Sequence, residues 1–221
     1  MIYPLSRRGT SKPQEGEIVI NLPLDGNLTD YSGNGLHFSG TNPVFETDEG
    51  RKVLKVTVNA EYIHLHDTVP LSERGAFILS FINNFRVEFD FKRIVAASEL
   101  QGYLYFAAPS GVWGICFMQD PSGTMQLCIS DGKISDKMGT FHQSQIPVGI
   151  WHKVIMERRP GGVLRYRVLN LLSGAIVYDL ETLSLIETIT SVSSQYIIIG
   201  MGTMNRVAKS YFRNFKIVKY L

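Results

Sequence analysis

The chain has 221 residues and a formal net charge of +2, from 22 basic and 20 acidic side chains. Hydrophobic residues make up 44% and charged residues 19% of the chain, a composition typical of a globular protein rather than a disordered one. All of the excess charge lies in residues 1–16, because residues 17–221 hold equal numbers of basic and acidic side chains. A protein that coats nucleic acid would carry a basic excess on its folded part, so we expect no nucleic-acid partner.

Residues 1–16 lack hydrophobic periodicity and form a predicted N-terminal arm, with residues 17–221 as one domain. The arm carries Arg7, Arg8 and Lys12. It is either a disordered tail or a segment held by a neighbouring chain or by the body of this chain, and we favour docking onto a neighbour through these three cations. No apolar segment follows the arginine pair, so we expect no secretory signal and synthesis in the cytoplasm. No apolar run reaches the roughly 18 residues that span a membrane, so we expect no membrane partner.

Period-two hydrophobic alternation recurs along the domain. From 85 to 92, apolar side chains alternate with charged ones, which is typical of a strand that is half buried. Turn sequences at 120–123 and 159–162 predict two hairpins. The predicted strands are 18–22, 53–58, 61–66, 85–92, 103–107, 112–118, 125–130, 151–158, 164–170, 175–180, 196–200 and 212–221. Short strands without intervening helices predict an all-β fold, an antiparallel two-sheet jelly-roll sandwich with a short N-terminal extension.

Six short motifs follow one another in a characteristic order. They are the opening segment at 22–35 with its Asp-x-Ser-Gly-Asn loop, the strands 61–65 and 85–91, the Gly-x-Trp-His-x-Val strand at 149–154, and the closing strands 196–200 and 211–217. Their order resembles the laminin-G-like, concanavalin-A-like lectin and glucanase jelly-roll superfamily. The resemblance implies the fold but no single function, because this fold hosts lectins, hydrolases, adhesion modules and virion components.

Glu88 and Asp90 are the candidate catalytic residues. The resemblance to laminarinase-like glucanases implies two carboxylates on one face of this strand, which could flank a glycosidic bond. Arg86 and Lys92 lie on the same face, however, and the four residues together read more simply as a solvated charge ladder. We therefore expect no enzyme activity, and a glycoside hydrolase is the less favoured alternative.

Two segments contain candidate metal ligands. Asp30, Ser32 and Asn34 stand at alternate positions in a glycine-rich loop, a spacing that suits calcium. The alternative is a turn in which these side chains bond the backbone. His64 and His66, followed by Asp67, could hold zinc, but outward-facing histidines are the preferred interpretation. We expect no other cofactor.

Two groups of side chains on the predicted central strands are further candidates. If the 120–123 hairpin is symmetric, Cys116 and Cys128 lie opposite each other, near disulfide distance, and we favour two reduced thiols. Tyr103, Tyr105 and Trp113 are candidate ligand-binding aromatics, because sugar rings stack on aromatic faces. Most aromatic rings in such a sandwich must nevertheless lie in the core.

Although residues 17–221 have no net charge, their two halves carry opposite net charges. Residues 17–132 carry a net charge of −7 and residues 133–221 a net charge of +7. We expect part of this asymmetry to become cross-strand pairing, while the remainder could support a homo-oligomer or a charged neighbour.

These observations favour a non-catalytic structural or adhesive module. We expect a virion component, a phage capsid or tail protein, that docks onto protein neighbours through its arm, acts outside the cell after release, and has a glycan as a further ligand. The alternative is a carbohydrate-binding module of a bacterial polysaccharide-use system.

Overall fold

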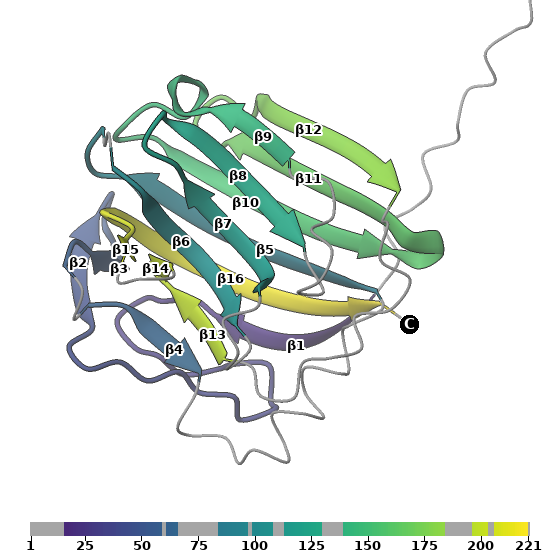
Figure 1. Ribbon diagram of the computed structural model, residues 1–221. Helices are drawn as coiled ribbons and strands as arrows, with labels where there is room; N and C mark the ends of the chain where they lie inside the picture. Colours follow the sequence, from purple (N-terminus) through teal and green to yellow (C-terminus); the bar gives the residue numbers. More distant parts are fainter. Residues whose placement is uncertain are drawn as a thin grey trace, which may run out of the picture.

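The computed structural model describes residues 16–58, 61–65, 84–96, 99–107, 113–129, 139–183, 196–202 and 206–220 (Figure 1). These residues form two antiparallel sheets packed face to face, which confirms the predicted all-β sandwich. The predicted arm lies outside this range except for Gly16, which begins the first strand. Within the described residues, no helix has the length and apolar character needed to cross a membrane.

The larger sheet has eight strands, and β1 (Gly16–Leu22) pairs with its strand β16 outside the main path. The other seven strands are, in spatial order, β12 (Ile176–Leu183), β11 (Val163–Asn170), β10 (Trp151–Arg159), β5 (Phe85–Arg93), β16 (Ser210–Tyr220), β3 (Arg51–Val56) and β2 (Val44–Asp48). Strands β5 and β16 therefore lie at the centre of this sheet, and β12 and β2 are its edges.

The smaller sheet has six strands and covers the inner face of the larger one (Figure 1). Its order is β4 (Ile63–Leu65), β13 (Tyr196–Ile199), β6 (Gln101–Ala107), β7 (Trp113–Gln119), β8 (Thr124–Ile129) and β9 (Gly139–His142). Strands β14 (Met201–Gly202) and β15 (Arg206–Val207) pair with each other in a short two-stranded sheet. There are also two 3₁₀ turns among the described residues, η1 (Gln143–Gln145) and η2 (Pro160–Gly162).

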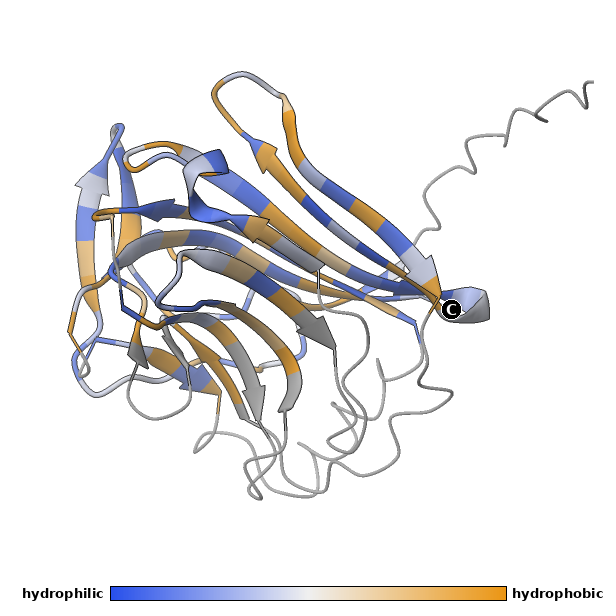
Figure 2. Cartoon of the chain, turned by 45° about the horizontal axis from the view of Figure 1, so that its top comes forward, coloured by the Kyte–Doolittle hydropathy of each residue, from blue (hydrophilic) through white to orange (hydrophobic). Residues whose placement is uncertain are grey.

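Hydrophobic and hydrophilic residues alternate along the central strands, as the sequence predicts (Figure 2). The apolar side chains of β5 point inward and meet those of the smaller sheet. The ring centroids of Phe89 and Phe91 lie 6.0 and 5.2 Å from that of Phe117 on β7. Burial of such rings is the main stabilising term of a sandwich core.

Both predicted hairpins are present. Strands β7 and β8 pair with Cys116 opposite Cys128, which confirms the register expected from a symmetric turn. Asp120 holds this turn by accepting hydrogen bonds from the Thr124 N–H at 2.9 Å and the Ser122 hydroxyl at 2.5 Å. Strands β10 and β11 form the second hairpin.

One end of the core is polar, which the sequence pattern does not predict. Arg93 continues the inward row of β5 and is only 3% exposed. Its guanidinium donates to the carbonyl oxygens of Gln143 and Ile146 at 3.1 and 3.2 Å, so it ties the loop after β9 to the larger sheet. His152 and Tyr103 are also buried, and burial lowers the pKa of His152 and raises that of Tyr103.

Candidate functional site

Several of the residues selected from the sequence lie outside the described part of the chain. Among them are the three cations of the arm and the second histidine of the zinc candidate with the aspartate after it: Arg7, Arg8, Lys12, His66 and Asp67. Tyr105 and Trp113 belong to β6 and β7, but their side chains are outside the described part. Their proposed roles stay predictions.

Tyr103 lies in the core. Its side chain is fully buried, and its ring centroid is 5.4 Å from that of Phe91 and 4.9 Å from that of Phe117. Its hydroxyl lies 2.9 Å from Gln101 Oε1 and 3.2 Å from Gln119 Oε1. This burial leaves no face of the Tyr103 ring available to a sugar, so it corrects the expectation of a ligand-binding role.

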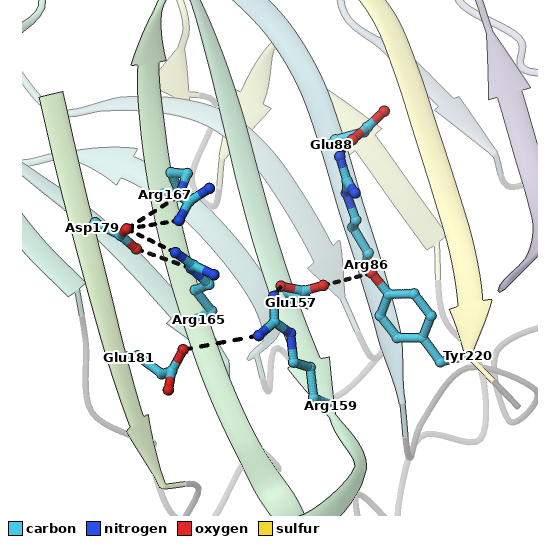
Figure 3. Close-up of polar contacts among 9 residues, drawn as sticks. All are labelled: Arg86, Glu88, Glu157, Arg159, Arg165, Arg167, Asp179, Glu181 and Tyr220. Atoms are coloured by element: carbon cyan, nitrogen blue, oxygen red, sulfur yellow. Dashed lines mark hydrogen bonds and ion pairs between the residues drawn. The ribbon is translucent and has the colours of Figure 1, made fainter. Parts of the chain in front are cut away.

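Glu88 and Asp90 share the outer face of β5, as the alternation predicts. The expectation that this face is solvated is wrong for both residues, because Asp90 is only 3% and Glu88 only 9% exposed. Strands β10 and β16 flank β5 on either side. Arg86 forms an ion pair with Glu88, which is two residues further along the same strand (Figure 3).

Asp90 is the centre of a cross-strand network. Its Oδ2 accepts hydrogen bonds from Asn214 Nδ2 at 2.7 Å and from Arg213 Nε at 3.4 Å, both on β16. Its Oδ1 lies 3.0 Å from Lys153 Nζ on β10. The Asp90 carboxylate thus joins three adjacent strands through contacts with two cations and one amide.

The ladder continues toward the β12 edge (Figure 3). Glu157 Oε1 accepts a 2.6 Å hydrogen bond from the Tyr220 hydroxyl, and its Oε2 lies 2.6 Å from Arg159. Burial and this hydrogen bond raise the pKa of Tyr220 to about 12. Further along, Arg165 and Arg167 both donate to Asp179.

This arrangement does not suit glycoside hydrolysis. A glycosidase needs one carboxyl group kept protonated as the acid and a second that can act as nucleophile or base. Glu88, Asp90 and Glu157 are each bound to at least one cation, and no pair of them is left to divide those two tasks. The charge-ladder interpretation therefore describes the observed contacts.

The ladder also explains part of the charge asymmetry between the two halves of the sequence. Lys153 and Arg213 from the basic half both pair with Asp90 from the acidic half. Lys209 pairs with Glu99 in the same way. These contacts confirm that part of the −7 and +7 charges becomes pairing within one chain.

Trp151 is buried on the outer face rather than in the core between the sheets. Its indole N–H donates to Asp48 Oδ2 at 2.8 Å, and the guanidinium carbon of Arg213 lies 4.0 Å from its ring centroid. Lys92 Nζ lies 5.6 Å from the same centroid and 2.6 Å from Asp48 Oδ1. Each of the two cations beside the Trp151 ring also pairs with a carboxylate, Lys92 with Asp48 and Arg213 with Asp90.

The Asp30 loop forms a network of turns rather than an open ring of oxygen atoms. Asp30 Oδ1 accepts hydrogen bonds from the backbone N–H groups of Asn21 and Ser32, both at 2.9 Å. Its Oδ2 accepts from the Ser32 hydroxyl at 2.7 Å and the Leu36 N–H at 3.1 Å. The Asn34 amide donates to the carbonyl oxygen of Val19 at 3.0 Å. A calcium ion here would have to displace these donors.

The histidine candidate has one described member. His64 Nε2 lies 3.3 Å from the Ser39 hydroxyl, and its ring centroid is 5.7 Å from that of Tyr62. Among the described residues, no group of three or more His, Cys, Asp or Glu side chains is arranged to hold a metal ion.

One exposed aromatic residue was not selected from the sequence. Tyr31, inside the same loop, is 57% exposed. Asn27 Nδ2 lies 3.4 Å from the Tyr31 hydroxyl and 3.3 Å from Asp25 Oδ1. The signal that could have found it is an aromatic residue among amide, hydroxyl and carboxylate side chains in a turn-rich segment, where no strand face can bury it.

Comparisons with known proteins show the fold. No family model and no curated protein matches the sequence. The binding domain of botulinum neurotoxin DC in complex with rat synaptotagmin II is 15% identical, with a TM-score of 0.64 over 93% of this chain and 49% of that one. The same kind of domain in complex with SialylT is 16% identical, with a TM-score of 0.63 over 93% and 48%.

Domain 4 of AbnA, a GH43 extracellular arabinanase from Geobacillus stearothermophilus, was solved in complex with arabinotriose and is similar over almost its whole length. It is 12% identical, with a TM-score of 0.61 over 94% of each chain. The present chain spans about half the length of the neurotoxin binding domains. At these identities the likeness extends to the β-sandwich fold and no further.

Proposed function

We propose that this chain is a non-catalytic binding module whose ligand is a glycan. The observation that carries the proposal is that the acidic residues on the outer face of the larger sheet form ion pairs with neighbouring cations. Glu88, Asp90 and Glu157 are each paired with a cation, so these three carboxylates offer no acid and nucleophile pair for glycoside hydrolysis. These ion pairs support a role in binding without chemistry.

The comparisons support a glycan as the ligand. One similar structure is a neurotoxin binding domain in complex with SialylT, and another is an arabinanase domain in complex with arabinotriose. Both are β sandwiches of this architecture, and the second has the same extent as this chain. A third similar structure is a complex with rat synaptotagmin II. The experiment must therefore distinguish a glycan ligand from a protein ligand.

A glycan array with the full chain tests the proposal. We expect selective binding to a small set of oligosaccharides, and incubation with those oligosaccharides should leave them intact. Absence of binding to any glycan would refute the glycan ligand, and release of shorter products would refute the non-catalytic role.

The virion role, docking through the arm and action outside the cell after release stay predictions from the sequence. The arm lies outside the described residues, and the comparisons do not concern it. Deleting residues 1–16 and measuring assembly onto a candidate neighbour would test these predictions separately from glycan binding.

A further inference from the structure

We infer that the loop from Asp25 to Gly35 is the glycan-binding surface and that the Tyr31 ring is its stacking platform. The inference rests on the proposed function, and it names the site and the class of sugar. The loop lies in the connection between β1 and β2 (Figure 1) and is joined to β1 by several hydrogen bonds.

The first reason is the exposure of the ring. Tyr31 is 57% exposed, more than any other Phe, Tyr or Trp whose side chain the structure describes. Phe and Tyr rings on the strands are largely buried, as Phe91 and Tyr103 illustrate. An aromatic ring can bury a large apolar area, so an exposed one retains that area for contact with a ligand.

The second reason is the polar rim beside the ring. Asn27 Oδ1 accepts the Thr29 N–H at 2.9 Å, which fixes the orientation of the amide. The amide N–H₂ is then directed at the Tyr31 hydroxyl and at Asp25. Amide, phenol and carboxylate together supply donors and acceptors, and each sugar hydroxyl needs both.

The third reason is that the loop is already held in place. The Tyr31 N–H donates to the carbonyl oxygen of Asn21 at 2.9 Å, and the Phe38 N–H donates to that of Leu28 at 3.0 Å. Asp30, next to Tyr31, is 5% exposed and accepts four hydrogen bonds. A platform fixed in this way loses little conformational entropy when a ligand binds.

The charge of the rim selects the class of sugar. Asp25 is exposed and acidic, and on the rim its carboxylate accepts a hydrogen bond from the neutral amide of Asn27. The Asp25 carboxylate would repel an acidic sugar. A neutral pyranose or furanose can stack on the Tyr31 ring and donate hydroxyl hydrogen bonds to the Asp25 carboxylate. We therefore assign neutral glycans to this site.

The test compares variants on the neutral glycan that binds best to the wild-type chain on an array, by calorimetric titration. Tyr31→Ala should weaken binding by about tenfold or more, and Tyr31→Trp should retain it, because the indole offers a larger stacking face. Leu172→Ala is the matched control, since Leu172 is 83% exposed in the β11–β12 connection, four strands away from β1 across the sheet. It should leave affinity unchanged.

The outcomes separate this inference from the proposed function. If the wild-type chain binds a neutral glycan and Tyr31→Ala binds it equally well, the assignment of the site is wrong while the proposed function stands. If the wild-type chain binds acidic glycans alone, the assigned sugar class is wrong. If it binds no glycan, both the function and the site are refuted. Circular dichroism of each variant excludes unfolding, which we do not expect at so exposed a position.

Discussion

Asp30 offers the sharpest test of how the Tyr31 loop is held. In the structure its carboxylate accepts three backbone N–H groups, from Asn21, Ser32 and Leu36, and the Ser32 hydroxyl. Asp30→Ala leaves the three N–H groups without their acceptor. Asp30→Asn keeps one oxygen for two of the donors but turns an amide N–H₂ toward the Leu36 N–H.

The expected magnitude follows from these contacts. A hydrogen bond to a charged group contributes about 1.5–3 kcal/mol, and water can replace part of the loss where the donor is partly exposed. We therefore expect Asp30→Ala to lower the free energy of unfolding by about 3 kcal/mol, and Asp30→Asn by about half as much. For a domain of this size, about 3 kcal/mol corresponds to a decrease in Tm of roughly 6–12 °C.

The assay is thermal unfolding followed by circular dichroism, with urea unfolding as the second measurement of the same free energy. The wild-type chain should show the same Tm in a calcium chelator and in added calcium, because the carboxylate oxygens already accept protein donors. Wild-type stability in both variants would refute the account of the loop. A Tm that rises with calcium in the wild-type chain and not in Asp30→Asn would establish the calcium site instead.

Three further predictions concern the framework. Asp90→Ala should lower the free energy of unfolding by about 3 kcal/mol, because it leaves the partly buried Arg213 without its carboxylate; an unchanged urea midpoint would show that the network contributes nothing. Because burial depresses the pKa of His152, the unfolded state binds the extra proton first, so stability should fall as the pH drops below about 6.5, by up to about 1.4 kcal/mol per pH unit. Urea unfolding from pH 7.5 to 5 measures this, and an equal slope in His152→Gln would contradict it. Gly200→Ala should cost about 2–4 kcal/mol, since Gly200 has a φ of 91° and an added Cβ would lie 2.5 Å from Val56 Cγ2; an unaltered Tm would contradict the packing argument.

Most strands could be predicted from the sequence, because strict alternation of apolar and polar residues places the apolar side chains on the face of the strand that packs against the core. Residues 85–91 show the strict alternation of β5, and the 120–123 turn places Cys116 opposite Cys128. Strands β2 and β9 were not predicted. β2 is an edge strand without a buried side chain, and β9 has four residues, so neither carries a long hydrophobic signal.

The outer face could not be predicted from a single strand. The sequence shows Asp90 between Lys92 and Glu88, but the partners that bury it, Lys153 and Arg213, lie far along the chain. Arg93 was likewise outside the predicted strand, although it continues the inward row. Local alternation identifies the face of a residue, whereas its burial depends on the long-range register of the neighbouring strands.

Native mass spectrometry of the full chain mixed with a library of neutral and acidic oligosaccharides tests the central claim most directly. The account predicts a complex whose mass equals the chain plus one intact oligosaccharide, with no shortened product in the mixture. A spectrum without any complex, or one in which the oligosaccharide is recovered as fragments, would contradict a non-catalytic glycan-binding module.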